Sequence, residues 1–393
     1  MTFAPAAPDV AEIAARTRAF VREVCLPAEE RFRAHDLDPA LRAELQAAAR
    51  QAGVFAPHVP SEFGGLGLDI SGWSVVFEEA GYSLLGPQAL NCAAPDEGNM
   101  HLLEVVATEE QKERYLRPLA SGEVRSCFAM TEPHPGAGSD PAALATQARR
   151  TDDGWVIDGS KRFISGADGA AFSICMARAE EGATMFMIDA ENPGWQVGRR
   201  METTDTVFAG GHSEVEIREC LVGPDAVLGE LGQGFRYAQV RLGPARLTHC
   251  MRWLGLARRA LDLALDRASE REVFGSRLEE LGLAQGLIAD SVIDLEASRS
   301  LIRWAAGVLD SGAQGRHETS VAKVFVAEAV WRVIDRALQL TGGDGVTADL
   351  PLARFLNEVR PFRIYDGPSE THRWAIARRA SRVRAAEREA VGS

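Results

Sequence analysis

The chain lacks several patterns that would assign it to a well-defined class of protein. Its six cysteines form no Cys-x-x-Cys pair, which argues against a zinc site or a redox pair. No apolar run approaches the roughly 20 residues that cross a bilayer, and the N-terminus has no continuous apolar stretch of a secretory signal. We therefore expect a soluble, cytoplasmic protein with buried reduced thiols, no metal site and no membrane association.

An excess of positive charge and a dinucleotide fingerprint are also missing. The net charge is -13, which argues against a general nucleic-acid surface. No glycine group stands in the order strand, G-x-G-x-x-G, helix and distal acid, so a nicotinamide-binding domain is not expected. The basic cluster near the end, Arg378, Arg379, Arg382 and Arg384, is either the solvated face of a terminal helix or a site for a polyanion.

The 393 residues are enough for two or three domains with full cores. Apolar residues recur at helical spacing over 10–53, 71–84 and 108–120, and Thr108 with Gln111 is typical of a capping box. From Ser126, short apolar runs separated by Gly, Asp and Pro predict a small antiparallel β-domain. The 3.6-residue period returns after Gly234. We predict an N-terminal helical domain (1–125), a middle β-domain (126–237) and a C-terminal helical bundle (238–393).

A single carboxylate, Asp366, stands directly before a Gly-Pro turn with helix-like sequence on both sides. Such an Asp most often caps the helix that follows. The alternative is that Asp366 is a catalytic base, because other polar and glycine-rich segments accompany it elsewhere in the chain.

Two of these segments lie in the predicted β-domain. After an expected strand, residues 130–140 offer backbone N–H groups and hydroxyls suited to carbonyl or phosphate oxygens, although a plain surface turn has the same composition. Asp158-Gly159 predicts a hairpin that returns into a strand, on which Phe163 and Ser165 share a face. There an aromatic ring could cover a flat cofactor and a hydroxyl could reach a ring nitrogen; otherwise Phe163 is core and Ser165 is exposed.

Two further segments lie in the predicted bundle. Arg271 stands at a break between helices, and a guanidinium fork suits a pyrophosphate, although a surface ion pair is the commoner role. Gly342, Gly343 and Gly345 follow a helix, and a simple helix cap explains only one of them. The others would let a ligand approach the backbone closely.

In sequence order, these segments resemble the acyl-CoA dehydrogenase family over almost the whole chain. The matching motifs are Thr131-Glu132-Pro133…Gly138-Ser139-Asp140, Arg271-x-x-Phe274-Gly275, Gln339-x-x-Gly342-Gly343-x-Gly345 and Tyr365-Asp366-Gly367. The resemblance implies a mainly α fold with a central β-domain: an N-terminal helical domain, a middle antiparallel β-domain and a C-terminal four-helix bundle. The ending Asp-Gly-Pro-x-Glu-x-His is similar to the branch that contains acyl-CoA dehydrogenase family members 10 and 11.

The resemblance also implies an activity in fatty acid metabolism: FAD-dependent α,β-dehydrogenation of an acyl-CoA to the trans-2-enoyl-CoA. Asp366 would remove the α-proton, hydride would pass to flavin N5, and an electron-transferring flavoprotein would accept the electrons. A flavin shared between subunits implies a homo-oligomer, a dimer or a homotetramer. FAD contacts are implied for Phe128, Met130, Thr131, Phe163, Ser165, Arg271, Phe274, Gln339, Gly342, Gly343, Ser369 and Glu370, and acyl-CoA contacts for Ser139, Arg246 and Arg378.

The chain departs from the family pattern in four places. The base is Asp366 where Glu is usual, so the substrate or the backbone would have to lie closer by about 1 to 1.5 Å for proton transfer. The Thr-Glu-Pro turn is longer than usual, with His134 and Pro135 as additions. Gly282 replaces a Gln that touches the cofactor in many members. Ala245 stands where other members keep their base, so no second carboxylate competes with Asp366.

Two other functions are compatible with the same scaffold. One is a flavin-dependent oxidase of a small carbon acid, as in the nitroalkane oxidases, which use an Asp base and oxygen. The other is a flavin-containing binding protein similar to the DNA-associated relatives of the family, although those carry a basic C-terminal region.

Overall fold

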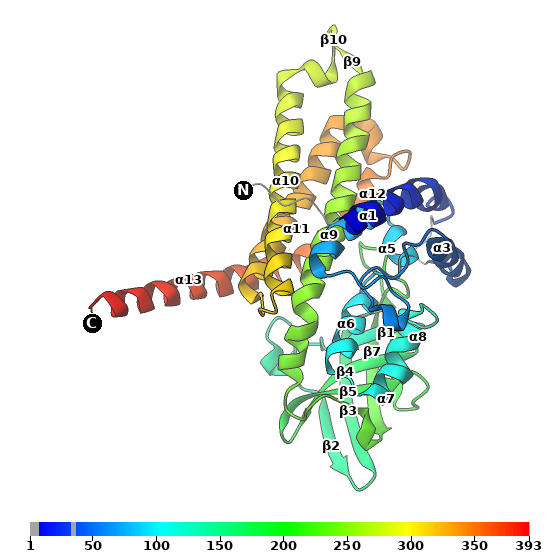
Figure 1. Ribbon diagram of the computed structural model, residues 1–393, viewed down its shortest axis with the longest axis vertical. Coiled ribbons are helices and arrows are strands. Elements are labelled where there is room, and N and C mark those ends of the chain that lie inside the picture. The colour runs from blue at the N-terminus through cyan, green and yellow to red at the C-terminus, as the bar shows by residue number, and fades with distance from the viewer. Residues whose placement is uncertain (1–7, 33–36, 393) are drawn as a thin grey trace. The chain divides into compact units, whose positions relative to one another are not determined.

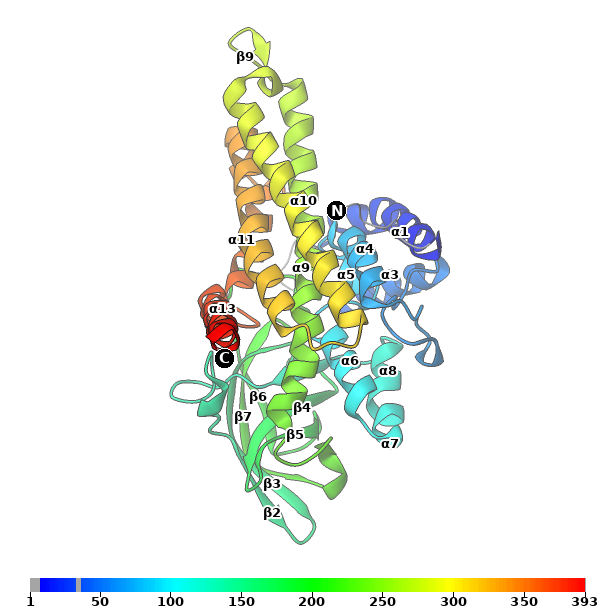
Figure 2. The same cartoon turned by 60° about the vertical axis from the view of Figure 1, so that its left-hand side comes forward.

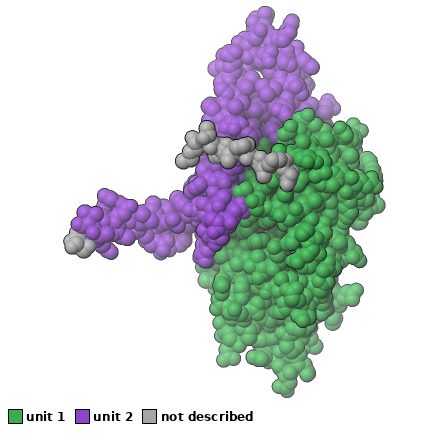
Figure 3. Space-filling view, in the orientation of Figure 1, with its two compact units in different colours: residues 1–245 green, residues 246–393 purple. Residues whose placement is uncertain are grey.

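The computed structural model describes residues 8–32 and 37–392. It contains two compact units, Met1–Ala245 and Arg246–Ser393, shown in two colours in Figure 3. The long helix α9 (Gly234–Glu270) crosses from one unit into the next. This division into units does not test the predicted domain boundaries, and the three-domain division stays a proposal.

The first part of unit 1 is helical, as predicted. Side chains cap several helices: Asp69 accepts from Gly72 N at the start of α4, and Thr108 and Gln111 form the predicted capping box. The α-helices are α1 (Pro8–Phe20), α2 (Leu26–Ala28), α3 (Pro39–Gln51), α4 (Ile70–Gly81), α5 (Gly86–Ala89), α6 (Asp96–Val106), α7 (Glu109–Gln111) and α8 (Arg117–Ala120), joined by π-turns η1 (Val21–Cys25) and η3 (Lys112–Leu116) and the 3₁₀ turn η2 (Ser61–Phe63).

The second part of unit 1 is a twisted β-sheet. Its order is β6-β7-β3-β2-β4-β5-β8, with β1 beside β4. Most pairs are antiparallel, as predicted, but β1 and β2 both run parallel to β4. Trp155, Phe186 and Trp195 fill its core. The strands are β1 (Ser126–Ala129), β2 (Gln147–Thr151), β3 (Gly154–Ser165), β4 (Phe172–Ala179), β5 (Gly182–Asp189), β6 (Trp195–Met201), β7 (His212–Val222) and β8 (Val227–Leu228), with 3₁₀ turns η4 (Pro141–Ala143) and η5 (Pro224–Ala226).

The hairpin predicted at Asp158-Gly159 is wrong. Strand β3 runs without a turn through both residues, and the hairpin lies earlier, where Thr151 pairs with Gly154. Gly159 is needed for close packing instead, because a Cβ there would lie 2.5 Å from Thr146 Oγ1. The Asp158 side chain accepts a hydrogen bond from Glu219 N at 2.7 Å. Both residues therefore serve contacts between neighbouring segments.

Unit 2 is a helical bundle. Figures 1 and 2 show α10 (Gly282–Asp310) and α11 (Arg316–Thr341) packed along each other, with the hairpin β9 (Glu272–Val273) and β10 (Ser276–Arg277) at the end of the bundle where α9 leads into α10. Asp294 on α10 binds both Arg332 and Arg336 on α11. The remaining elements are η6 (Leu278–Glu280), η7 (Gly342–Val346), α12 (Leu352–Val359), η8 (Arg360–Arg363) and α13 (Ser369–Gly392), which extends away from α11 in Figure 1.

The six cysteines are free and buried, which confirms that prediction. Over residues 8–32 and 37–392, no helix is both long and apolar enough to cross a bilayer. Within the same ranges, no group of three His, Cys, Asp or Glu side chains is arranged to hold a metal ion.

Candidate active site

Asp366 lies in a sharp turn between η8 and α13. Its φ is +54° and that of Gly367 is +97°, so two consecutive residues adopt the left-handed region. Asp and Asn are the non-glycine residues that tolerate this region best. Among the described residues, six non-glycine positions have positive φ, and three of them are predicted site residues: Phe163, Phe274 and Asp366. Strained backbone of this kind clusters at functional sites.

The Asp366 carboxylate is held beside an imidazole. Its Oδ2 atom lies 3.5 Å from His249 Nε2, and the two side chains are 19% and 6% exposed. Oδ2 is buried and has no hydrogen-bond partner among the described residues. Buried carboxylate oxygens are normally satisfied, so this atom is available to a ligand.

The neighbours of His249 indicate which of its nitrogens carries hydrogen. Nδ1 lies 3.2 Å from the guanidinium of Arg252 and 3.4 Å from the hydroxyl of Tyr365, which itself accepts from Trp253 Nε1 at 2.6 Å. Since two donors face Nδ1, this atom acts as the acceptor and Nε2 carries the hydrogen. The Nε2–H side of His249 thus lies 3.5 Å from Asp366 Oδ2 without forming a hydrogen bond to it.

Three basic side chains hold the backbone of the turn. The carbonyl of Asp366 accepts from Arg246 Nε at 2.9 Å and from His372 Nε2 at 3.1 Å, and the carbonyl of Gly367 accepts from Lys323 Nζ at 2.7 Å. His372 Nδ1 lies 3.0 Å from the Ser320 hydroxyl. These contacts fix the turn through its main chain and leave the carboxylate for chemistry.

Burial is the largest cause of the pKa shifts of Lys323, His372 and Arg246. It lowers the pKa of Lys323 to about 8, although the charge of Asp366 opposes the shift. Burial and the charge of Arg246 lower the pKa of His372 to about 4, so His372 is neutral near pH 7 and its Nδ1 can accept from Ser320. Burial also lowers the pKa of Arg246.

A second group of predicted residues gathers in unit 1, where the chain leaving β1 meets β3. Arg162 N donates to Thr131 O at 2.9 Å, and Lys161 Nζ lies 3.4 Å from Met130 O. Phe163 is the next residue, at an irregularity in the pairing of β3 with β7, and it is 51% exposed at φ +59°. An exposed aromatic residue thus directly follows the point where β3 contacts the Met130–Thr131 segment. The ring of Phe128, also predicted, lies 4.2 Å below the guanidinium of Arg241.

Glu132 fixes the long turn that follows Thr131. Its carboxylate accepts hydrogen bonds from Ala137 N, Ala145 N, Thr146 N and the Thr146 hydroxyl, and it pairs with Lys161 at 2.9 Å. Burial alone would raise the pKa of Glu132, but Lys161 and the donors hold it at about 2. Glu132 is therefore a structural anion. Ser139, farther along this turn, is exposed.

Ser165 contacts His212, which in turn contacts Asp205, and the sequence singled out neither of these two partners. Its hydroxyl lies 2.8 Å from His212 Nδ1, and His212 Nε2 lies 3.1 Å from Asp205 Oδ2. His212 and Asp205 are 9% and 6% exposed. The three side chains form a continuous hydrogen-bonded series.

Among the predicted nucleotide-binding residues of unit 2, Arg271 lies beside Gly342. A Cβ on Gly342, whose φ is +65°, would lie 3.2 Å from a guanidinium nitrogen of Arg271. Gly343 is exposed with open space around it, and Phe274, on the β9–β10 hairpin, is 98% exposed at φ +53°. Gly345 has a packing role, because a Cβ there would lie 2.1 Å from Thr341 Oγ1. Gln339 is exposed on the last turn of α11.

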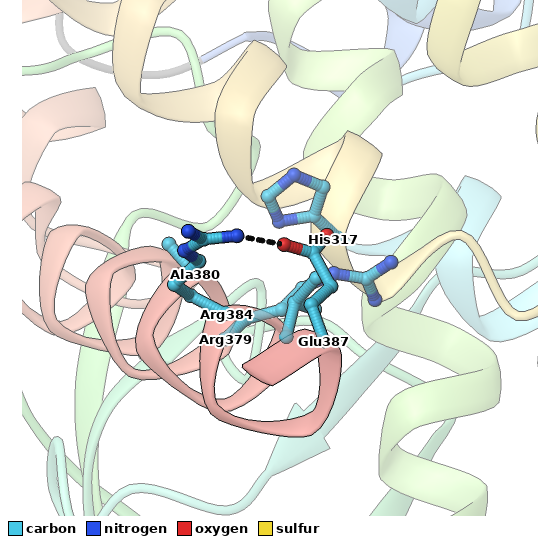
Figure 4. A pocket seen from close by; sticks show the side chains of 6 residues that line it. His317, Arg379, Ala380, Arg384 and Glu387 are labelled. Carbon is cyan, nitrogen blue, oxygen red and sulfur yellow. Dashed lines mark hydrogen bonds and ion pairs between the residues drawn. The ribbon is translucent and has the colours of Figure 1, made fainter. Parts of the chain in front are cut away.

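The remaining predicted residues lie at the start of α13 and along it. Ser369 is buried and Glu370 is exposed. Arg378 is exposed, and its guanidinium lies 4.6 Å from the centre of the Trp374 ring. A cleft of about 420 Å³ lies nearby, lined by His317 of α11 and by Arg379, Ala380, Val383, Arg384 and Glu387 of α13 (Figure 4). Arg384 and Glu387, three residues apart on α13, form an ion pair, and Arg378 is not among the lining residues.

Each unit by itself carries features that suit part of a flavin nucleotide. In unit 1, the exposed residue Phe163 stands at a strained backbone position. In unit 2, the exposed residue Phe274 is strained in the same way, the space around Gly343 is open, and Arg271 supplies a guanidinium beside Gly342. Flat apolar surface, close backbone approach and a cationic fork suit an isoalloxazine ring and a pyrophosphate. Together with an available buried carboxylate, they are features of a flavin-dependent dehydrogenase.

Comparison with known proteins supports a flavin-dependent dehydrogenase and identifies its family. Family models for the N-terminal, middle and C-terminal domains of acyl-CoA dehydrogenases match residues 7–123, 127–220 and 232–381. The chain belongs to the acyl-CoA dehydrogenase family, a family of FAD-dependent oxidoreductases, and the predicted family and fold class are confirmed.

Two curated relatives illustrate the range of similarity. A probable acyl-CoA dehydrogenase, FadE2, of Mycobacterium tuberculosis is 37% identical over 86% of this chain and 85% of its own length. Human acyl-CoA dehydrogenase family member 11 is 34% identical over 93% of this chain, but over only 49% of its own length. The chain thus spans about half the length of that relative.

Solved structures have the same fold. A putative acyl-CoA dehydrogenase from Mycobacterium abscessus has a TM-score of 0.88 at 35% identity, covering 96% of this chain and 98% of that one. A glutaryl-CoA dehydrogenase from Mycobacterium smegmatis, solved in complex with FADH2, has a TM-score of 0.86 at 25% identity, covering 95% of each chain.

Proposed function

We propose that the protein dehydrogenates an acyl-CoA thioester between its α and β carbons, with Asp366 as the base. The observation that carries the proposal is the buried Oδ2 of Asp366, which has no hydrogen-bond partner within residues 8–32 and 37–392. It lies in a turn held by Arg246, His372 and Lys323. A positioned, poorly solvated carboxylate can take a proton from a weak carbon acid. His249 Nε2 lies 3.5 Å from the same carboxylate on one side.

FAD is the proposed cofactor, and its N5 position supplies the acceptor for the β-hydrogen as hydride. From unit 1, we propose that Phe128, Met130, Thr131, Phe163 and Ser165 contact the ring. In unit 2, the proposed contacts are Arg271, Phe274, Gln339, Gly342, Gly343, Ser369 and Glu370. Ser139, Arg246 and Arg378 are the proposed contacts for the acyl-CoA.

The test is anaerobic mixing of the FAD-loaded protein with a panel of acyl-CoAs that differ in length, branching and hydroxylation. We expect at least one of them to bleach the flavin absorbance and to yield the 2-enoyl-CoA. Failure of every acyl-CoA, combined with hydrogen peroxide formation from nitroalkanes in air, would favour the oxidase of small carbon acids instead.

Arg271→Ala is expected to weaken FAD binding by about ten- to a hundredfold, because a charge-assisted hydrogen bond contributes about 1.5 to 3 kcal/mol. Fluorescence titration of the apo-protein with FAD measures the change in Kd. Arg277→Ala is the matched control, since Arg277 lies on the same hairpin, is exposed and pairs only loosely with Glu279 at 3.8 Å. Equal affinities of the two variants would remove Arg271 from the cofactor site.

We further propose that the protein is a homo-oligomer, a dimer or tetramer, that it is cytoplasmic, and that an electron-transferring flavoprotein reoxidises it. Family membership and the strong exposure of Phe274, a predicted cofactor contact, support the oligomer.

A further inference from the structure

The series Ser165–His212–Asp205 is built by the pairing of strands. Ser165 ends β3 and His212 begins β7, and the two residues are direct antiparallel partners. Directly opposed side chains on neighbouring strands are close enough to interact. The hydroxyl and the imidazole therefore meet because of the register of the sheet, at 2.8 Å.

Asp205 reaches the far side of the imidazole because the loop between β6 and β7 is packed tightly. A Cβ on Gly210 would lie 2.2 Å from Asp168 O, and one on Gly211 would lie 2.5 Å from Arg200 Nε. Both glycines have positive φ. Thr203 donates to the carbonyl of Asp205 at 3.1 Å. The positive φ at both positions favours glycine, and at Gly210 the backbone of Asp168 leaves no room for a side chain, so the loop that carries Asp205 is closely packed before His212.

The hydrogens of this series can be assigned from its chemistry. Burial opposes ionisation of Asp205, but the hydrogen bond with His212 holds the pKa of Asp205 below its usual value. An ionised carboxylate only accepts, so the hydrogen of a neutral His212 sits on Nε2. Nδ1 is then an acceptor and takes the hydroxyl hydrogen of Ser165. The oxygen of Ser165 is left with lone pairs to offer to a ligand.

We propose that Asp205 and His212 fix the Ser165 hydroxyl as a hydrogen-bond acceptor toward the flavin. This inference rests on the proposed function, in which Ser165 contacts the ring. A hydrogen-bond acceptor binds a flavin ring nitrogen that carries hydrogen more strongly than a ring nitrogen that presents a lone pair. Asp205 and His212 are thus positioning residues, which favour binding of the reduced cofactor over the oxidised one. No bond is made or broken in this step.

The other charged groups near His212 are engaged by partners of their own. The guanidinium of Arg125 donates hydrogen bonds to the carbonyls of Ala209 and Gly166, at 2.9 and 3.5 Å. Arg200 lies beside Gly211. Glu214, two residues along β7, is engaged by Arg199 at 3.0 Å and by Arg162 at 3.4 Å. The charge of Glu214 is therefore balanced by its own partners.

The first test uses the apo-protein, so it does not depend on the cofactor or on the reaction. The ¹⁵N chemical shifts of the His212 ring in the wild type should show hydrogen on Nε2 and none on Nδ1. A hydrogen on Nδ1 would overturn the proposal, because Nδ1 would then donate to Ser165 and turn its hydroxyl hydrogen toward the ligand.

The second test measures the midpoint potential of bound FAD without substrate. Ser165→Ala should lower the potential, since the lost hydrogen bond weakens binding of the reduced cofactor about fivefold relative to the oxidised one. For a two-electron couple this is about 20 mV. A potential that stays constant or rises would contradict the acceptor role.

Asp205→Asn and Asp168→Asn form a matched pair for the same measurement. The first places an amide opposite His212 Nε2, which moves the ring hydrogen to Nδ1, reverses the Ser165 hydroxyl and lowers the potential. Asp168 is exposed nearby, and its change should leave the potential constant. Equal midpoint potentials in the two variants would show that Asp205 does not position the Ser165 hydroxyl.

A separate assay asks whether the protein without FAD hydrolyses a thioester. If it does, and if Ser165→Ala abolishes that hydrolysis, Ser165 is a nucleophile and the proposal is overturned.

Discussion

Asp366→Asn is expected to bind FAD like the wild type and to lose reduction of the flavin by acyl-CoA by about 10²- to 10⁴-fold, the usual contribution of a general base. The amide has nearly the size of the carboxylate but cannot take the α-proton. Anaerobic stopped-flow measurement of flavin bleaching gives the rate, and FAD absorbance of the purified variant gives the occupancy.

The fold of this variant should be preserved, so the loss can be assigned to chemistry. Asn tolerates the left-handed φ of +54° as well as Asp does. The contacts from Arg246, His372 and Lys323 go to main-chain carbonyls, which the substitution leaves in place. Asp335→Asn, an exposed acid on α11, is the charge-matched control. Wild-type bleaching rates in Asp366→Asn would exclude Asp366 as the base.

The same geometry bears on the choice of Asp over Glu. Longer side chains adopt positive φ less readily than Asp and Asn, which can also hydrogen-bond locally. In this chain, the turn conformation itself favours the shorter acid. A substrate that reaches farther toward the turn is then the expected complement, and the acyl-CoA panel tests for it.

The fold was predictable because it follows from periodicity. The change from helical spacing to short apolar runs and back was visible in the sequence, and the capping box at Thr108 is present. The hairpin at Asp158-Gly159 failed because Asp-Gly describes a local preference only. Gly159 is explained by the approach of Thr146, a contact that depends on how β2 and β3 pair.

The surroundings of Asp366 were only partly predictable. His249 and Lys323 were missed, because they come from α9 and α11 and reach the turn only through the packing of those helices. A signal existed for each. Lys323 is a lone charge in the apolar run 321–326, and His249 follows Arg246 at helical spacing on the same face. Neither signal names a partner, since the sequence of one helix does not show which helix it faces.

The hydrogen-bonded series Ser165–His212–Asp205 could likewise not be predicted, because the sequence of one strand does not show which strand it pairs with. Ser165 was selected by resemblance, but its partner His212 depends on strand register, and Asp205 depends on the conformation of a loop. The Gly210-Gly211 pair directly before His212 was the one visible sign of a tightly packed loop.

Lys161→Met is expected to destabilise the protein by about 3 to 5 kcal/mol, because it leaves the buried carboxylate of Glu132 without its counter-charge. The two side chains are 0% and 2% exposed and lie 2.9 Å apart. Urea denaturation measures the free energy of unfolding. Arg149→Met is the matched control on the neighbouring strand, where an exposed pair with Asp158 at 3.4 Å should contribute less than about 1 kcal/mol. Equal losses in the two variants would contradict the prediction.

The pH dependence separates the ion pair from loss of packing. The pKa of Glu132 is about 2 in the folded protein against 4.5 unfolded, so its contribution to stability is full above pH 4.5 and is lost as the pH falls toward 2. Without Lys161 the lowering of the Glu132 pKa is smaller. The free energies of unfolding of the wild type and of Lys161→Met should therefore converge as the pH falls from 4.5 toward 2. Glu132→Gln in the Lys161→Met background should recover part of the loss by removing the unpaired charge. Lys161 also lies 3.4 Å from Met130 O, so the single variant should bind FAD more weakly as well.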